Sequence, residues 1–202
     1  MQLKNSMPYD LSPTPPILPQ LTVHKGAVIW LTALSGAGKT TLAKLLHADL
    51  LALERKSITL DGDELRKGLC SDLGFDETGR TENIRRTAEV AKLLAQNELI
   101  AICSLISPFE RDRAQVRFSC HRDNICFSEV FISAPLELCE KRDPKGLYVR
   151  ARNGEISNFT GINSSYEAPQ EPDLILQTDI HSASKCCAEL LNHVVLKTNI
   201  TG

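Results

Sequence analysis

A glycine-rich turn that ends in a lysine and two threonines is the pattern in this chain best suited to chemistry. It reads Ala33-Leu-Ser-Gly-Ala-Gly-Lys-Thr40 and lies between an apolar run and a stretch of helical period, which is the context that a phosphate-binding loop requires. Glycines let backbone N–H groups wrap around phosphate oxygens, the lysine bridges the terminal phosphates, and the threonine hydroxyl holds Mg²⁺. We therefore predict that ATP and Mg²⁺ bind here, with Lys39 catalytic and Thr40 on the metal. The predicted ATP-binding residues of the turn are Ala33, Leu34, Ser35, Gly36, Ala37, Gly38, Lys39, Thr40 and Thr41.

The first position of this turn departs from the usual pattern, because Ala33 stands where glycine is usual. If the φ angle there is positive, the alanine Cβ costs on the order of 1 kcal/mol. If φ is negative, the replacement is nearly silent. The alternative for the whole segment is a glycine-rich turn that binds no ligand, and the Gly-Lys-Thr sequence argues against it.

Two carboxylates, Asp61 and Asp63, follow the second apolar run. Open α/β sheets bind their ligands at the carboxyl ends of their strands, so we expect both carboxylates at the catalytic edge. We predict that Asp63 accepts or orients the proton of an acceptor hydroxyl and that Asp61 acts on the water shell of the metal. The alternative role for Asp63 is a helix N-cap, since Glu-Leu-Arg follows it.

Arginines are dense just after this acidic pair, at Arg66, Arg80, Arg85 and Arg86. Planar guanidinium groups bind phosphate and sulfate bidentately, so this density predicts a doubly anionic substrate. The alternative for any one of them is a surface ion pair with Glu82 or Glu89 on a solvated helix.

Composition places these groups in one domain without a strong overall charge. The 202 residues are 42% hydrophobic and carry a formal net charge of -2, which gives no general attraction for nucleic acid. The seven cysteines are odd in number and include no Cys-x-x-Cys pair, which is typical of a reducing cytoplasm. The longest apolar runs are too short for a membrane helix, and the proline-broken start resembles no secretory signal. We expect no nucleic-acid partner and no membrane.

Apolar β-rich runs alternate with helical stretches from residue 25 onward, which predicts an α/β fold with a parallel sheet between helices. The predicted strands are Ala27–Thr32, Ser57–Leu60, Leu99–Leu105, Ile125–Ser133 and Asp173–Gln177. The predicted helices are Lys39–Glu54, Arg80–Asn97, Glu110–Phe118, Leu136–Arg142 and a last one from Ser182 to about Leu196. Residues 1–24 are expected to form an extended arm, and residues 25–202 the catalytic domain. The segment Asp143–Gln170 is too long for an ordinary connection and is expected to be functional.

Several separated blocks together resemble one family, the adenylylsulfate kinases. The blocks are Leu34-Ser-Gly-Ala-Gly-Lys-Thr, Leu60-Asp-Gly-Asp, Asp72-Leu-Gly-Phe, Glu82-Asn-Ile-Arg-Arg, Ile106-Ser-Pro, Arg142-Asp-Pro-Lys-Gly-Leu-Tyr and Asn158-Phe-Thr-Gly-Ile, between about Gly26 and about Leu196. The resemblance implies a P-loop NTPase-type three-layer fold and transfer of the γ-phosphate of ATP to the 3′-hydroxyl of adenosine 5′-phosphosulfate (APS). It also implies a cytoplasmic homodimer. At 202 residues we expect no fused sulfurylase, so any coupling is expected with a separate ATP sulfurylase.

The resemblance also assigns roles to individual residues. It implies that Arg66, Arg80 and Asn83 contact the phosphosulfate and ribose of APS. It implies that Phe75 and Phe159 stack on the adenine, which suits a flat heterocycle. It implies that a lid at about residues 143–170 closes over both nucleotides. The remaining implied site residues are Ile106, Ser107 and Pro108 beside the acceptor, Lys145, Gly146 and Leu147 on the substrate side of the lid, and Arg142 on the ATP side. Ser107 is included among the catalytic residues, although direct in-line transfer needs no phosphoserine.

The chain departs from the family pattern at Glu64 in place of Asn, at Leu105 in place of Phe, and at Phe109-Glu-Arg in place of a tyrosine-arginine run. Two alternative functions stay open: a P-loop kinase of another small alcohol, such as a sugar acid or an antibiotic, and a nucleotide-binding regulatory protein without turnover. The aromatic pair favours a nucleoside acceptor over a sugar acid. The intact catalytic set of Lys39, Thr40, Asp61 and Asp63 argues against a protein without chemistry.

Overall fold

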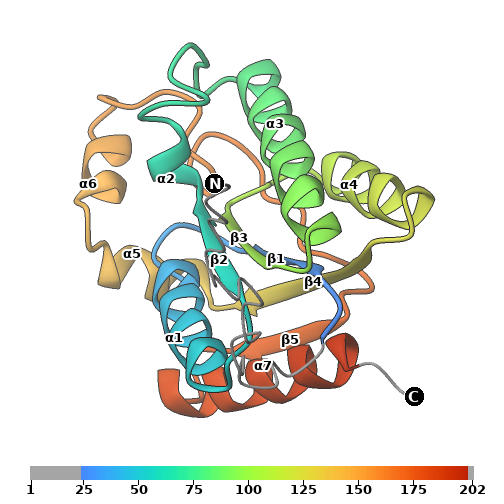
Figure 1. Ribbon diagram of the computed structural model, residues 1–202. Helices are drawn as coiled ribbons and strands as arrows, with labels where there is room; N and C mark the ends of the chain where they lie inside the picture. The colour runs from blue at the N-terminus through green and yellow to red at the C-terminus, as the bar shows by residue number, and fades with distance from the viewer. Residues whose placement is uncertain (1–23, 200–202) are drawn as a thin grey trace, which may run out of the picture.

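Five parallel strands form the sheet of this protein in the order β2-β3-β1-β4-β5, within residues 24–199, which the computed structural model describes (Figure 1). The strands are β1 (Ala27–Thr32), β2 (Ser57–Asp61), β3 (Ile100–Leu105), β4 (Cys126–Ser133) and β5 (Leu174–Gln177). All six residues of the central strand β1 are buried. Its unbroken apolar sequence is what a strand covered on both faces requires.

Helices cover both faces of this sheet. They are α1 (Lys39–Ala52), α2 (Gly62–Leu65), α3 (Glu77–Gln96), α4 (Glu110–Arg122), α5 (Leu136–Arg142), α6 (Leu147–Arg152) and α7 (Ala183–Thr198). Figure 1 shows α1 and α7 together on one side of the sheet, α3 and α4 together on the other, and α5 and α6 near the start of α1. The predicted three-layer α/β architecture is therefore confirmed.

The two faces of the sheet build two separate hydrophobic cores. Ile29 and Leu31 of β1 pack with α1 and α7, whose contribution includes Leu46 and Leu190. Val28 and Trp30 of β1 belong to the other core, which includes residues of α3 and α4. Because successive side chains of a strand point to opposite faces of the sheet, β1 packs against helices on both faces.

Strand register brings the carboxyl ends of the strands to one level. Thr32 at the end of β1 pairs with Leu105 of β3 and Phe131 of β4, and Asp61 at the end of β2 pairs with Ser104. The segments that leave these ends therefore start beside one another. This is the edge at which open α/β sheets bind their ligands.

The predicted strands are confirmed to within one residue at each end, but two short helices were not predicted. One is α2, and the other is α6, which lies inside the segment 143–170 that the sequence presents as a long loop. α3 begins earlier than predicted because Asp76 caps it, accepting a hydrogen bond from the Gly79 N–H at 2.8 Å. The predicted arm lies outside the described residues except for His24, which forms an antiparallel bridge with Asn199.

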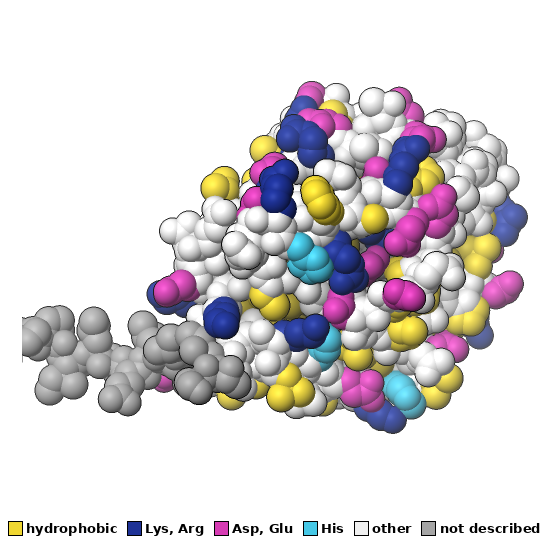
Figure 2. Space-filling model, turned by 90° about the vertical axis from the view of Figure 1, so that its right-hand side faces the viewer, with side chains coloured by type: hydrophobic (Ala, Val, Ile, Leu, Met, Phe, Trp, Pro, Cys, Tyr) yellow, Lys and Arg dark blue, Asp and Glu magenta, His cyan; other side chains and the backbone are white. Residues whose placement is uncertain are grey.

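Charges on the surface are mixed rather than segregated. Figure 2 shows one face of the molecule, on which basic and acidic side chains are interspersed. Ligand recognition must therefore be sought in local groups of charges at the strand ends. None of the helices described is long and apolar enough to cross a membrane.

Candidate active site

The glycine-rich turn connects β1 to α1 with two residues in the left-handed region. Gly36 has a φ angle of 76° and Gly38 one of 110°, and Gly38 is the N-cap of α1. A Cβ on Gly36 would lie 2.8 Å from the backbone oxygen of Cys139 in α5. Both positions therefore need glycine, and the N-terminus of α1 follows the turn directly, where it can face a phosphate.

Ala33, the departure at the first position of the turn, fits the structure without strain. It is fully buried in the hydrophobic core, and it is not one of the described non-glycine residues with positive φ. The φ angle of Ala33 is therefore not positive, and the replacement of glycine by alanine causes no backbone strain.

We predict that Ala33→Gly leaves kcat and the KM for ATP within about twofold. The same change lowers the free energy of unfolding by about 1–2 kcal/mol, because glycine loses more entropy on folding and the buried methyl group is lost. Urea unfolding and steady-state kinetics measure the two effects. A gain in ATP affinity of about fivefold or more would contradict the geometry, since it would show that alanine strains the loop.

Lys39 is a buried cation beside this turn. Its Nζ donates to the backbone oxygens of Ala33 at 3.1 Å and Leu34 at 2.7 Å. Burial lowers the pKa of Lys39 to about 8, although the nearby carboxylates Asp61 and Asp63 oppose the shift. The ammonium group is thus poorly satisfied by water and well placed to gain from a bound anion.

We predict that binding of a non-hydrolysable ATP analogue weakens as the pH rises above about 8. Phosphate oxygens favour the charged lysine, so binding above this pKa takes up a proton and affinity falls by up to about tenfold per pH unit. Below it the lysine is already charged and affinity stays level. Calorimetric titrations in buffers of different ionisation enthalpy measure both affinity and proton uptake. Lys39→Arg, whose guanidinium stays charged, should lose the dependence, and a level affinity to about pH 9.5 in the unmodified protein would contradict the prediction.

The residues predicted for the metal lie next to each other. The Thr40 hydroxyl donates to Asp61 Oδ2 at 2.8 Å, while Asp61 Oδ1 accepts from the Asp63 N–H at 3.0 Å. Asp61, and not Asp63, is therefore the N-cap of α2. A hydroxyl and a carboxylate are hard oxygen ligands, and Mg²⁺ in kinases takes only one or two protein ligands beside phosphates and water. These oxygens fit such an ion, although the described residues contain no cluster of three metal-binding side chains.

Asp63 faces the lid. Its carboxylate forms an ion pair with Lys145, in the segment between α5 and α6. The adjacent Glu64 pairs instead with Lys67 at 2.7 Å, and both of those side chains are exposed. The unusual glutamate therefore turns its charge to a surface pair and leaves Asp63 as the carboxylate toward the lid.

Two of the four arginines gather around Phe75. The Arg66 guanidinium lies 4.3 Å from the centre of the Phe75 ring and donates to the backbone oxygens of Leu73 and Gly74. Arg80 is 8% exposed and donates to Phe75 O at 2.8 Å and to Asn158 O at 2.7 Å. Arg80 therefore ties the loop of Phe75 to the lid segment before Phe159. Burial is the main cause that lowers the pKa of Arg80, and the charge of Arg66 adds to it.

The other two arginines are held in ion pairs, with Arg85 exposed and Arg86 half-buried. Arg85 pairs with Glu82 at 2.6 Å, and Arg86 pairs with both Glu82 and Asp72. The alternative interpretation offered by the sequence, surface ion pairs, holds for these two.

The second aromatic ring belongs to the folded part of the lid. Phe159 is 7% exposed and meets Tyr148 of α6 edge-on, with ring centres 4.9 Å apart. Phe75, in contrast, is 57% exposed. Asn83 is buried, and its Nδ2 is one of the buried polar atoms without a hydrogen-bond partner among the described residues. A side-chain amide in this position is free to donate to a ligand.

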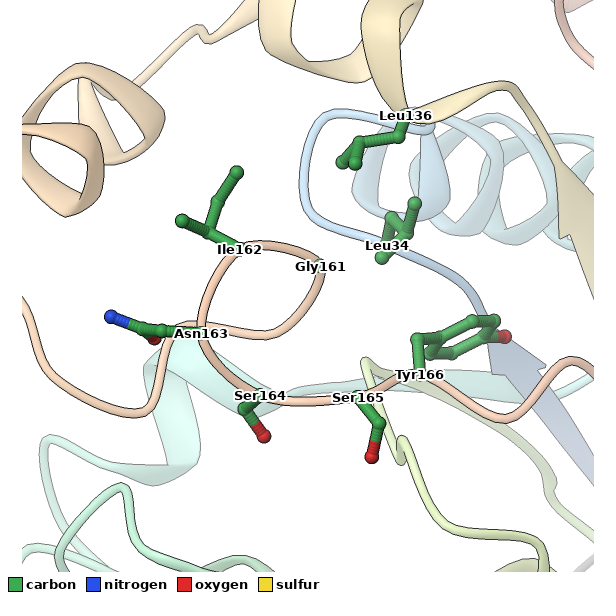
Figure 3. A pocket seen from close by; sticks show the side chains of 8 residues that line it. All are labelled: Leu34, Leu136, Gly161, Ile162, Asn163, Ser164, Ser165 and Tyr166. Carbon is green, nitrogen blue, oxygen red and sulfur yellow. The ribbon is translucent and has the colours of Figure 1, made fainter.

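A hollow of about 670 Å³ separates the phosphate-binding turn from the lid. It is lined by Leu34, Leu136, Gly161, Ile162, Asn163, Ser164, Ser165 and Tyr166. Figure 3 shows the side chains of Leu34, Leu136 and Ile162 pointing into the same space from the turn, from α5 and from the lid. The turn, α5 and the segment 161–166 therefore line one hollow.

The turn is contacted by the lid, by the end of α5 and by the segment after β5, which the sequence did not reveal. The Tyr148 hydroxyl donates to Ser35 O at 3.0 Å, and the Thr178 hydroxyl donates to Ala37 O at 2.8 Å. Arg142 donates to Thr178 O at 2.6 Å and lies near Gly36 O, so it belongs with the phosphate-binding turn. Gly146 and Leu147 begin α6, where Asp143 accepts from the Leu147 N–H at 2.8 Å. The contacts of Tyr148, Arg142 and Thr178 with the turn are long-range and carry no local sequence signal.

Ile106, Ser107 and Pro108 leave the end of β3 at the same edge. Ser107 is 3% exposed, and its Oγ accepts a hydrogen bond from Trp30 Nε1 at 3.1 Å. Leu105, the residue in place of phenylalanine, is buried below this loop. The structure therefore turns the serine hydroxyl toward the core.

Comparison with known proteins shows the family to which the chain belongs. A family model described as "Adenylylsulphate kinase" matches residues 25–177. The chain belongs to the adenylylsulfate kinase family. The family predicted from the sequence blocks is thereby confirmed.

Members of the adenylylsulfate kinase family align with most of the chain. The adenylyl-sulfate kinase of Clostridium acetobutylicum is 50% identical over 171 residues, which are 85% of this chain and 84% of that protein. The APS kinase of Mycobacterium tuberculosis, solved in complex with AMPPNP and APS, has a TM-score of 0.82 at 44% identity and covers 84% of this chain and 98% of that one. A hexameric APS kinase from Thiobacillus denitrificans has a TM-score of 0.65 at 30% identity, with 86% of this chain and 29% of that chain covered. The P-loop fold expected for an adenylylsulfate kinase is confirmed by these likenesses.

Proposed function

We propose that this protein transfers the γ-phosphate of ATP to the 3′-hydroxyl of APS, giving 3′-phosphoadenosine 5′-phosphosulfate (PAPS) and ADP in sulfate activation. The observation that supports this acceptor is Arg80, which joins the loop of Phe75 to the lid segment before Phe159. Aromatic faces suit a flat base, and guanidinium groups suit phosphate and sulfate. A nucleotide that carries an extra anionic group offers a flat base to the aromatic rings and negative charge to the guanidinium groups.

On the donor side, the glycine-rich turn holds the phosphates of ATP through its N–H groups and the start of α1. Lys39 neutralises charge on the terminal phosphates, where its buried ammonium gains most from an anion. Arg142 and Thr178, which bond to each other at the turn, flank the nucleotide. Thr40 and Asp61 would hold Mg²⁺, which when bound would supply positive charge to the transferring phosphate.

On the acceptor side, Asp63 accepts the proton of the 3′-hydroxyl or orients that hydroxyl for in-line attack. Lys145, its ion-pair partner, brings a cation from the lid to the same place. Arg66, Arg80 and Asn83 bind the phosphosulfate and ribose. The adenine stacks between Phe75 and Phe159. The rest of the acceptor site is lined by Ile106, Ser107, Pro108, Gly146 and Leu147. The lid of about residues 143–170 excludes water when it closes.

A panel of acceptors tests this proposal. ADP release from MgATP is measured with APS, with adenosine 5′-phosphate, with gluconate and with no acceptor. We expect APS to give the highest kcat/KM. Faster turnover with gluconate than with APS would indicate that the acceptor is another small alcohol. Binding of ATP without turnover on any acceptor would support the alternative of a regulatory protein.

We also propose that the enzyme is a homodimer in the cytoplasm and takes APS from a separate ATP sulfurylase. The cysteines support the compartment, since all seven are unpaired and six of them are buried. Sedimentation velocity tests the assembly. A dimer is expected, whereas a monomer or a hexamer would contradict this part of the proposal.

A further inference from the structure

Arg113 of α4 is a fully buried cation that the proposed transfer does not use. Its Nε donates to Glu129 Oε1 of β4 at 2.7 Å, and the Glu129 side chain is almost as deeply buried. The guanidinium also pairs with Glu110 in the first turn of α4. A buried charge is costly unless it is paired and hydrogen-bonded. These carboxylates satisfy only part of its donor set.

The remaining donors of Arg113 reach two backbone oxygens, one six residues before it in the loop after β3 and one far along the chain in the lid. Nη1 donates to Ser107 O at 2.8 Å, and Nη2 donates to Glu167 O at 2.8 Å. Ser107 belongs to the loop after β3, and Glu167 belongs to the last part of the lid. One guanidinium therefore spans both segments.

The loop at Ser107 is strained and held from several directions. Ser107 has a φ angle of 40°, in the left-handed region that non-glycine residues rarely adopt. Trp30 Nε1 donates to its hydroxyl, and the Thr32 hydroxyl donates to Ile106 O at 2.7 Å. A conformation of this kind persists only where the surroundings fix it, and Arg113 holds its carbonyl.

The end of the lid is docked on the same loop. The Glu167 N–H donates to Pro108 O at 2.8 Å, and Glu167 Oε2 accepts from the Glu110 N–H at 2.6 Å. The Tyr166 hydroxyl lies 3.0 Å from Thr32 Oγ1. The C-terminal end of the lid and the loop after β3 therefore form one unit, with Arg113 at its buried side.

We propose that Arg113 is a positioning residue for the acceptor, because it fixes the Ser107 loop and the lid's C-terminal end relative to each other. This rests on the proposed function, in which that loop lies beside APS. The planar fork of arginine reaches separate acceptors at once, whereas the ammonium of lysine is a single point charge. Arg113→Lys keeps the positive charge but loses the planar guanidinium group that reaches several acceptors.

The test compares Arg113→Lys with Arg117→Lys. Arg117 also pairs with Glu129, at 3.1 Å, but its other ion pair is with Asp173. We expect Arg113→Lys to lower kcat/KM for APS by about 100-fold, since small misplacements of a reactant are costly, while the KM for ATP stays within about twofold. Arg117→Lys should change neither value.

Fluorescence gives a second measurement that needs no substrate. Trp30 is the one tryptophan of the chain, and its N–H contacts Ser107. Emission should shift to longer wavelength in Arg113→Lys and stay unchanged in Arg117→Lys, because only the first change loosens the loop above the indole.

Equal rises in both KM values, or no change in kinetics and emission, would overturn the role of Arg113. If the unmodified protein does not turn over APS, the proposed function fails, and the emission of the two variants still decides whether Arg113 fixes the loop. If Arg113→Lys does not fold, Tyr166→Phe removes a contact of the same unit. It should then raise the KM for APS selectively, and an unchanged or unselective KM would overturn the proposal.

Discussion

Replacement of Lys39 by methionine is expected to lower kcat for PAPS formation by about 1,000-fold or more. Methionine fills the space of the lysine stem but carries no charge to stabilise the transferring phosphoryl group. The protein should stay folded, because burial already disfavours the charged lysine, as its lowered pKa shows. Single-turnover kinetics and thermal unfolding measure the two effects.

Lys44→Met is the matched control, since Lys44 lies on the same helix α1 and is exposed. Its activity should equal that of the unmodified protein. If Lys39→Met kept more than about a tenth of the activity, the buried lysine would not stabilise the transition state as proposed.

Asp63→Asn is expected to lower kcat by about 100-fold to 10,000-fold, the range for loss of a general base. The amide keeps the shape of the side chain but cannot accept the proton of the 3′-hydroxyl. Binding of ATP should change little, because Asp63 contacts the metal-binding pair only through its N–H, which the replacement retains.

Glu64→Gln provides the matched control for this change. Glu64 is the next residue of α2 and is also acidic, but it pairs with Lys67 on the surface. Loss of its charge should leave kcat within about twofold. Equal losses in both variants would indicate a general effect of negative charge near α2, and Asp63 would lose its specific role.

The elements that could be predicted from the sequence are those with a strong local pattern. Continuous apolar runs marked the strands, and β1 was predicted with its observed bounds, Ala27–Thr32. The short helices α2 and α6 were missed because four and six residues show no helical period. Their stability depends on side-chain caps, and Asp143 before α6 was a signal that could have found the second.

The candidate site was predictable where spacing and chemistry coincide, as in the turn from Ala33 to Thr40. Sequence could not separate Arg66 and Arg80, which gather at Phe75, from Arg85 and Arg86, which pair on the surface. All four lie in one short stretch, and their direction depends on packing. Arg113, Tyr148 and Thr178 were missed for the same reason, since each has a partner that is distant in sequence.

ATP labelled in the γ-phosphate shows most directly which oxygen receives the transferred phosphate. The protein is incubated with Mg²⁺, APS and ATP labelled in the γ-phosphate, and the nucleotides are separated by anion exchange beside a Lys39→Met control. Label is expected to appear in PAPS, to be removed by a 3′-nucleotidase, and to be absent from the control. Label that stays on ATP, or that enters a product resistant to the 3′-nucleotidase, would contradict it.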